Sequence, residues 1–359
     1  MKKLPSKTVR GFWSRKAFEV QFHWIFIMIA GAIILTFFIT VVTKYQSVSE
    51  ERFSLVLSKQ LETILSGASI AKQTTQHIQL PLPLKTSCTE TCACSFSTGT
   101  KVTQLKGTSL FSPSVLAGKE LIYTTHDWNI PFRAGVFVYL TDDQQQYALV
   151  YDPGDSASTA LLTKITQQLP QELSVKNISI TLLSSIVLQQ ENKKIHLIFL
   201  NTLPDAFALR NAQENSGVII TVITAAGGVQ FYARNTVQES NNVQIAQVPI
   251  ASTWTSDAEL VGAIFSDTQR SYACNLRQAY ARAQWIVQVQ NKRLDALQSR
   301  CSTTKIKETL AEFEKTMKVL SQEIGTQGEA PAVLTLRALQ HDLAQENQQL
   351  AKANCPTIY

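Results

Sequence analysis

The chain has 359 residues and a net charge of +6 at pH 7, with 33 Lys and Arg against 27 Asp and Glu. The apolar fraction of 45% excludes a wholly disordered chain, and the length is enough for a membrane anchor and about two domains. The segment before residue 20 contains one acidic residue, Glu19, and the six basic residues Lys2, Lys3, Lys7, Arg10, Arg15 and Lys16. The rest of the chain therefore carries about +1, which argues against a nucleic-acid partner.

An apolar segment follows this basic tail. Residues 22–43 read FHWIFIMIAGAIILTFFITVVT and contain no Asp, Glu, Lys or Arg. As a helix they reach about 33 Å, enough to cross the roughly 30 Å hydrocarbon core of a bilayer. We therefore expect a transmembrane signal anchor over residues 21–43. The membrane-interface residues are expected to be His23, Trp24, Lys44 and Tyr45.

The charge distribution predicts an orientation. Basic residues favour the cytoplasmic side, so residues 1–20 are expected to form a cytoplasmic tail and the C-terminal body to lie outside the cell membrane. The apolar segment is longer than the core of a cleaved signal peptide, and residues 45–49 lack a clean small-x-small cleavage site. An uncleaved, single-pass anchor is the prediction.

All the cysteines follow the span: Cys88, Cys92, Cys94, Cys274, Cys301 and Cys355. Outside the cytoplasm an even number of cysteines favours disulfides. The first three have a spacing that zinc could also use, but a second CxxC or a nearby His pair is missing. We predict no metal site and no cofactor.

Residues 44–77 are expected to form a membrane-proximal amphipathic helix. Its apolar residues recur at spacings of three and four, at Phe53, Leu57, Leu61, Ile64 and Leu65. This face could pack on the following domain or on the membrane surface, or it could form a coiled-coil dimer stalk. Pro81 and Pro83 favour extended chain after it.

Residues 78–252 predict a mixed domain, either α+β or an α/β sheet with antiparallel pairs. Two strands, Gly135–Thr141 and Tyr147–Tyr151, flank a polar turn and suggest a hairpin. A helix is expected at Ser156–Gln168 and a second hairpin around Gly227 and Gly228. Further strands are expected at Cys92–Ser97, Leu121–Thr124, Ile178–Leu183, Ile186–Gln189 and Lys194–Leu200.

Two groups in this domain could carry chemistry. Asp152 and Asp155 follow a strand, as in the carboxylate-bearing loops of α/β enzymes, but a turn that begins a helix explains them equally. His126 and Asp127 form a His–carboxylate pair without an evident nucleophile, and they could instead lie in a surface loop before a buried Trp. No catalytic residue is therefore assigned. Asn177 begins a possible glycosylation sequon.

Residues 253–359 predict a disulfide-stapled, antiparallel three-helix bundle resembling a coiled coil. Ser256 and Glu259 have the spacing of a capping box. Three apolar seams follow, with alternating steps of four and three. The seams contain Leu276, Tyr280, Ala283, Val287, Gln290, Leu294, Leu297 and Cys301, then Ile306, Leu310, Phe313, Met317, Leu320 and Ile324, then Leu336, Leu339, Leu343 and Leu350, with Glu346 at an apolar position.

The bundle predicts one disulfide directly. In an antiparallel arrangement Cys301 and Cys355 finish at the same end, so we expect them to pair. For the others two pairings remain open. Cys88 could bridge to Cys92, leaving Cys94 for Cys274, or Cys88 could bridge to Cys94, leaving Cys92 for Cys274.

Part of the chain resembles a known group of sequences. Phe18–Phe26, FEVQFHWIF, and its apolar continuation are similar to the N-termini of uncharacterised single-span surface proteins from small archaeal genomes. The Cys88, Cys92 and Cys94 cluster and the segment Trp128–Phe132 are similar to the same group. The resemblance covers about a third of the chain and implies a membrane anchor but no activity.

The leading functional hypothesis is a membrane-anchored cell-surface protein of structural or protein-interaction type, with the bilayer and another protein as partners. One alternative is an exported hydrolase-like enzyme that uses the mixed domain. Another is a pilin-like subunit or a component of an envelope or secretion assembly. A pilin-like leader places a Glu about five residues after its cleavage site, whereas Glu19 stands about eight residues after Arg10, with Arg15 and Lys16 between them.

Overall fold

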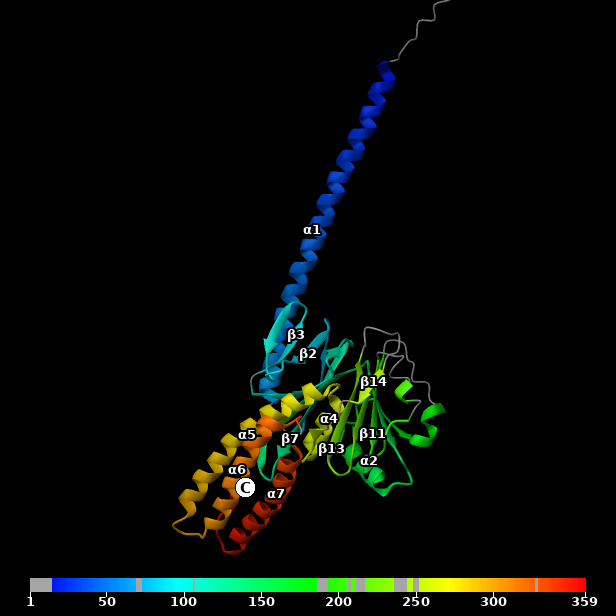
Figure 1. The fold of residues 1–359 in the computed structure, drawn as a ribbon. Coiled ribbons are helices and arrows are strands. Elements are labelled where there is room, and N and C mark those ends of the chain that lie inside the picture. The colour runs from blue at the N-terminus through cyan, green and yellow to red at the C-terminus, as the bar shows by residue number, and fades with distance from the viewer. Residues whose placement is uncertain are drawn as a thin grey trace, which may run out of the picture. The chain divides into compact units, whose positions relative to one another are not determined.

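The computed structural model describes residues 15–68, 73–105, 107–185, 193–205, 208–210, 217–235, 244–247, 252–326 and 329–359. The chain divides into two compact units, residues 1–53 and 54–359. Helix α1 (Arg15–Ala68) begins in the first unit and ends in the second. The described part is a mixed α+β fold, as expected (Figure 1). The strand expected at Ile186–Gln189 lies outside the described residues.

The first unit contains the apolar part of α1. Residues Trp24–Tyr45 form a stretch of 22 residues with no buried side chain, and it is the one helix of the described residues that is long and apolar enough to cross a membrane. The hydroxyl groups of Thr36 and Thr40 donate to the backbone oxygens four residues earlier, at 2.8 and 2.7 Å. The helix itself therefore satisfies these polar groups, as a lipid environment requires.

The last turns of α1 belong to the core of the second unit. Leu57, Leu61 and Leu65 are only 3%, 2% and 4% exposed, because they pack in one cluster with the strands that follow. The part of the predicted seam that these leucines form is therefore buried inside the protein's own domain, whereas Phe53 at its start is 56% exposed. The helix ends at Ala68, and Thr75–Gln79 is already strand β1, so the helix expected over residues 44–77 is too long at its C-terminal end.

Two four-stranded sheets lie next in the chain. Sheet A has the order β1 (Thr75–Gln79), β7 (Glu120–Asn129), β8 (Arg133–Asp142) and β5 (Ser109–Phe111), with only β5 and β8 parallel. Sheet B is antiparallel throughout and has the order β4 (Lys101–Gln104), β3 (Cys94–Thr98), β2 (Leu84–Cys88) and β6 (Val115–Leu116).

Sheet C has a parallel half and an antiparallel half. The parallel strands lie in the order β10 (Val175–Ser179), β9 (Gln145–Tyr151), β11 (Lys194–Leu200) and β12 (Val218–Ile223). The antiparallel strands are β13 (Gly228–Asn235), β14 (Gln244–Gln247) and β15 (Ser252–Thr253). Helix α2 (Ser156–Gln168) links β9 to β10, and the 3-10 helix η1 (Ile180–Ser185) follows β10. The helix at Ser156–Gln168 and the hairpin around Gly227 and Gly228 are confirmed.

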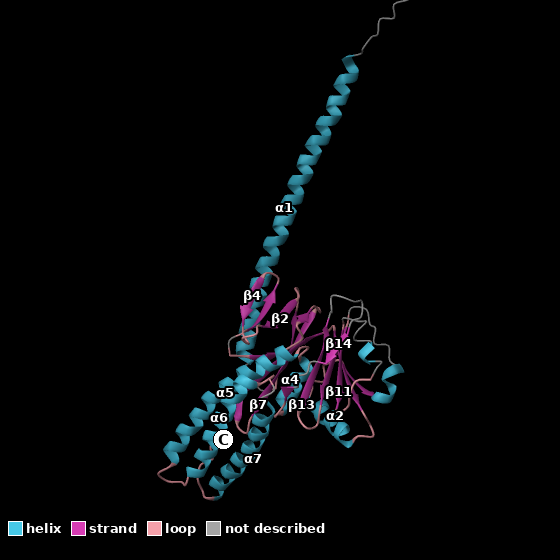
Figure 2. Cartoon of the chain, in the orientation of Figure 1, coloured by secondary structure: helices cyan, strands magenta, loops and turns pink. Residues whose placement is uncertain are grey.

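The strands alternate their side chains between separate layers. On β8, Phe137 and Tyr139 face the C-terminal helices within residues 257–352, whereas Val138 and Leu140 face α1 and sheet B. Successive residues of a strand point to opposite faces, so an almost wholly apolar strand is expected where both faces are covered. Figure 2 shows the sheets with helices beside them.

One predicted hairpin is wrong. The strands expected at Gly135–Thr141 and Tyr147–Tyr151 exist, but β8 pairs within sheet A and β9 pairs within sheet C. The polar turn between them therefore passes the chain from one sheet to the other. The strand expected at Ile178–Leu183 is shorter and earlier, because η1 begins at Ile180.

Four helices complete the fold: α4 (Asp257–Phe265), α5 (Gln269–Leu297), α6 (Thr304–Glu323) and α7 (Glu329–Lys352). Helix α6 packs on both α5 and α7, and the three lie close together in Figure 1. The apolar seam residues are largely buried. Glu346 is also only 5% exposed, and its carboxylate accepts a hydrogen bond from Thr309 at 3.0 Å. This core is continuous with the helix-facing side of sheets A and C.

Three disulfides cross-link the fold, two of them between elements far apart in the chain. Cys301 and Cys355 are bonded, as the seams predicted. For the other four cysteines, the structure selects Cys88–Cys94 and Cys92–Cys274 over the alternative pairing. The second of these ties the turn after β2 to α5. A zinc site at the first three cysteines is excluded, because their sulfur atoms are already bonded.

Candidate functional site

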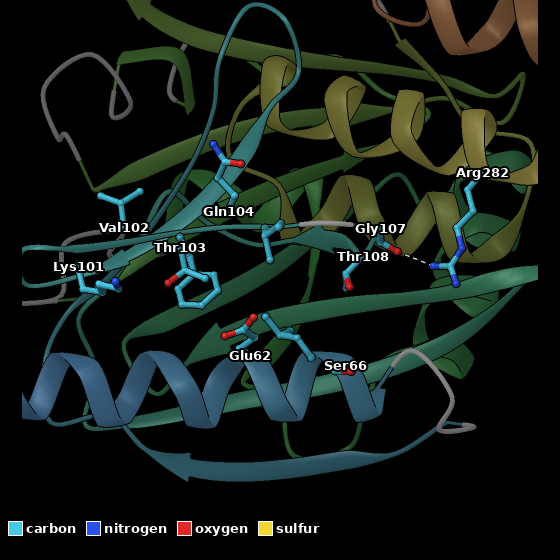
Figure 3. Close-up of a pocket in the computed structure, with 12 residues that line it drawn as sticks. Glu62, Ser66, Lys101, Val102, Thr103, Gln104, Gly107, Thr108 and Arg282 are labelled. Atoms are coloured by element: carbon cyan, nitrogen blue, oxygen red, sulfur yellow. Dashed lines mark hydrogen bonds between the residues drawn. The ribbon is translucent and has the colours of Figure 1, made fainter.

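A hollow of about 700 Å³ lies between the end of α1, the edge of sheet B and α5. Figure 3 shows Glu62 and Ser66 rising from α1 on one side and the residues of β4 on the other. Arg282 of α5 stands at one end. We call this hollow the α1–β4 groove. It is lined by Glu62, Leu65, Ser66, Phe96, Lys101, Val102, Thr103, Gln104, Leu105, Gly107, Thr108 and Arg282.

The groove follows from how α1 packs. Leu61 and Leu65 point into the core, so Glu62 and Ser66, one position further along the helix, are turned toward the groove. Opposite them, a tight turn joins β3 to β4. Gly99 in this turn has φ +56°, a backbone conformation that residues other than glycine rarely adopt.

Strand β4 presents an open edge to the groove. It lies at the end of sheet B and pairs with β3 alone among the described strands. Successive residues of a strand point to opposite faces, yet Lys101, Val102, Thr103 and Gln104 all line the same hollow. The hollow therefore runs along the strand edge, where backbone N–H and C=O groups point outward. Val102 is 62% exposed.

The ends and floor of the groove differ in character. Phe96 and Leu65 form an apolar floor, whereas Glu62 and Lys101 place opposite charges at its walls. The guanidinium of Arg282 donates a hydrogen bond to the backbone oxygen of Gly107, which fixes α5 to the loop that closes the far end. An extended peptide fits such a site, because the strand edge supplies backbone hydrogen bonds and the floor accepts side chains.

Asp152 and Asp155 lie where the sequence placed them, at the carboxyl end of β9. The strand order of sheet C reverses at β9, because β10 lies on one side of it and β11 on the other. Ligands of α/β folds commonly bind at such a switch point. Both carboxylates, however, are used by the fold. Asp155 caps α2 by accepting from the backbone N–H of Ala157 at 2.9 Å, and it accepts from Asn201 at 2.7 Å. Both bonds lower the pKa of Asp155, and the bond from Asn201 has the larger effect.

The turn carboxylate Asp152 has the same structural role. Its side chain accepts from the backbone N–H of Gly154 at 2.8 Å, which closes the turn before α2. The interpretation of Asp152 and Asp155 as a turn that begins a helix accounts for their bonds from Gly154 and Ala157, and the bond from Asn201 also ties this turn to the end of β11.

His126 and Asp127 do not form a catalytic pair, and the surface loop that was the other possibility is wrong. Both lie on β7, so their side chains point to opposite faces of sheet A. His126 is buried against the ring of Tyr139, whereas Asp127 pairs with Arg133 at 2.8 Å. Burial lowers the pKa of His126 and outweighs the carboxylates of Asp127 and Asp257, which raise it. Among the described residues no three His, Cys, Asp or Glu side chains gather as a metal site would require.

Asn177 is exposed on β10, the edge strand of the parallel half of sheet C. Its accessibility is compatible with the predicted sequon, and its glycosylation stays a prediction. His23 and Trp24 lie at the first end of the exposed apolar stretch of α1, and Lys44 and Tyr45 lie at the other end. Their place at a membrane interface also stays a prediction.

Sequence reasoning found Glu259 only as part of a capping box. Ser256 does cap α4, but the Glu259 carboxylate is fully buried and accepts hydrogen bonds from three elements. It accepts from the indole N–H of Trp128 at 2.9 Å, the hydroxyl of Tyr280 at 2.8 Å and the backbone N–H of Thr255 at 2.6 Å. Burial outweighs these bonds and raises the pKa of Glu259. The network ties sheet A to α4 and α5, so these contacts give Glu259 a structural role.

The chain matches no protein family, no curated protein and no solved structure with which it was compared. The function must therefore be argued from this geometry.

Proposed function

We propose that this protein is a single-pass, membrane-anchored surface protein that binds another protein through the α1–β4 groove. The observation that carries the proposal is the composition of one helix. Helix α1 contains a charge-free apolar stretch of 22 residues, and its last turns are part of the core of residues 54–359. A helix of this kind anchors a folded domain to a bilayer.

The orientation rests on charge and on cysteine chemistry. The basic residues before the span favour a cytoplasmic N-terminus, and the three disulfides of the folded domain favour an oxidising compartment on the other side. Within that domain, α5, α6 and α7 would act as an antiparallel bundle that the Cys301–Cys355 bond clamps at one end.

The binding role rests on the groove. An open strand edge is a liability that proteins usually cover or blunt. Here the edge of β4 borders a hollow with an apolar floor, which favours addition of a strand from a partner. Asp152, Asp155, His126 and Asp127 carry out structural tasks, and this weighs against the exported enzyme.

Site-specific photo-cross-linking in native membranes tests this function. A photoreactive residue replaces Val102, which is 62% exposed in the groove, or Leu334, which is 66% exposed on α7 and serves as a matched control. The proposal expects a protein adduct from position 102 and much less from position 334. Equal yields at both positions, or adducts with lipid alone, would contradict it.

A second candidate, a component of an envelope assembly, is favoured by one feature of α1. Ala32, Thr36 and Thr40 recur every four residues and line a shallow hollow along the apolar stretch. Small side chains on one stripe let another membrane helix approach closely. Replacing Ala32 with Leu would then reduce the size of the complex in blue-native gels, whereas an unchanged monomer would count against an assembly through this helix.

A further inference from the structure

Helix α5 has an outward-facing apolar surface that begins one turn after Arg282, the residue of this helix that lines the α1–β4 groove. Trp285 is 70% exposed and Val289, one turn later, is 51% exposed. Ile286 beside them is partly buried against the core. We call Trp285, Ile286 and Val289 the α5 apolar patch. An aromatic side chain this exposed on an ordered helix is unusual, and Trp is the residue most enriched among the energetic centres of protein interfaces.

A hollow of about 390 Å³ adjoins the patch and gives it depth. Ile286 and Val289 form one wall, and Phe132 and Tyr359 contribute from other parts of the chain. The rings of Phe132 and Tyr359 lie 5.7 Å apart between centroids, so the hollow has an aromatic side. A single aliphatic or aromatic side chain of a partner could fill it while Trp285 covers the neighbouring surface.

Basic side chains outnumber acidic side chains around the patch. Helix α5 carries five basic residues and one acidic residue, Asp295, whose carboxylate is paired with Lys307 of α6 at 2.5 Å. Of the basic residues, Arg282 and Arg293 are exposed beside the patch, and Lys292 is exposed one turn beyond Val289.

The guanidinium groups of Arg282 and Arg293 have neutral hydrogen-bond acceptors. Arg293 donates to the amide oxygen of Gln290 and the backbone oxygen of Ile358, and Arg282 donates to the backbone oxygen of Gly107. All these acceptors are neutral. Two acidic side chains also lie near this face: Glu314 of α6 accepts from Gln288 at 3.2 Å, and Asp127 pairs at 2.8 Å with Arg133, which lines the hollow.

We infer that the α5 apolar patch docks an acidic segment of a partner protein, with an apolar anchor residue in the hollow and carboxylates opposite Arg282, Lys292 and Arg293. Complementary charge favours this occupant. A second copy of the chain is disfavoured, because a two-fold contact would bring the same basic face against itself. The inference rests on the proposed function and names the chemistry of a partner at a second surface.

The test uses the full chain in native membranes. A photoreactive residue replaces Ala281, which is exposed one turn before Trp285, and the cross-linked peptide is sequenced by mass spectrometry. We expect an adduct with a segment of another protein that carries Asp or Glu beside an apolar residue. Trp285→Ala should reduce its yield about tenfold or more. Lys292→Glu should also reduce it, and Leu334→Ala on α7 should leave it within about twofold.

Each other outcome overturns the inference. An adduct with lipid would assign the patch to the membrane surface, and an adduct with the chain itself would assign it to a second copy. A segment without carboxylates, a yield unaffected by Trp285→Ala, or no adduct would each refute the acidic partner. The photoreactive residue at Val102 separates the two proposals. A protein adduct at 102 without one at 281 leaves the proposed function intact, and no protein adduct at either position removes both.

Discussion

Leu61 offers the sharpest test of how the anchor helix meets the folded domain. It is 2% exposed and packs among Leu84, Phe96 and their neighbours. Leu61→Ala removes three buried carbon atoms, worth about 2.4 kcal/mol in transfer free energy. The cavity left between α1 and sheet B raises the loss of unfolding free energy to about 3 to 4 kcal/mol.

The assay is urea unfolding of the full chain in lipid nanodiscs, followed by tryptophan fluorescence. Leu55→Ala is the matched control, because Leu55 lies on the same helix, is 39% exposed and undergoes the same chemical change. We expect the control to lose less than about 0.5 kcal/mol. If the two variants unfold at the same urea concentration, the last turns of α1 do not belong to the core, and the reasoning fails.

Three further predictions use the same unfolding assay. Replacing both Cys301 and Cys355 with Ser should lower the unfolding free energy by about 4 kcal/mol, because the bond spans 54 residues; no change would mean that the bond does not form. Burial raises the pKa of Glu259, so its contribution to stability is present below the usual carboxyl pKa and is lost as pH rises through the raised pKa. Glu259→Gln should therefore flatten the fall in stability that begins as pH rises above the ordinary carboxyl pKa of 4.5, and an unaltered pH profile would refute this assignment. Asp155→Ala removes the cap of α2 and should lower the urea midpoint while leaving cross-linking at position 102 unchanged, whereas loss of that cross-link would reopen a functional role for Asp155.

Local patterns in the sequence predicted much of the helical structure. The seam residues around Leu310 and Leu343 are buried, and Ser156–Gln168 is a helix with the expected bounds. The Cys301–Cys355 bond could be predicted because both residues stand at seam ends. These features depend on spacing within one or two neighbouring helices, which a single sequence records directly.

Features that depend on long-range packing could not be predicted. The α1–β4 groove combines Glu62 with Arg282, which lie far apart in the chain and meet only because α1 and α5 pack around the same sheets. The hairpin between β8 and β9 failed because the two strands join different sheets, although their turn looks local. Gly99 was an available signal for β4, since a glycine between two short extended segments is typical of a tight hairpin.

Helix α5 illustrates both cases. Its buried seam, with Leu276 and Val287, was visible as a heptad pattern. Its outward residues, Trp285 and Val289, interrupt the polar face, but the sequence alone did not distinguish them from further core positions. The α5 apolar patch became evident only when the burial of each side chain was known.

The exported orientation is tested most directly by labelling thiols on intact cells with a membrane-impermeant reagent. The account predicts that no cysteine of the chain reacts until a membrane-impermeant reductant is added, after which the partly exposed Cys301 and Cys355 become labelled. If these two cysteines stay unlabelled after this reduction and react only when the cells are lysed, the folded domain lies in the cytoplasm and the account is contradicted.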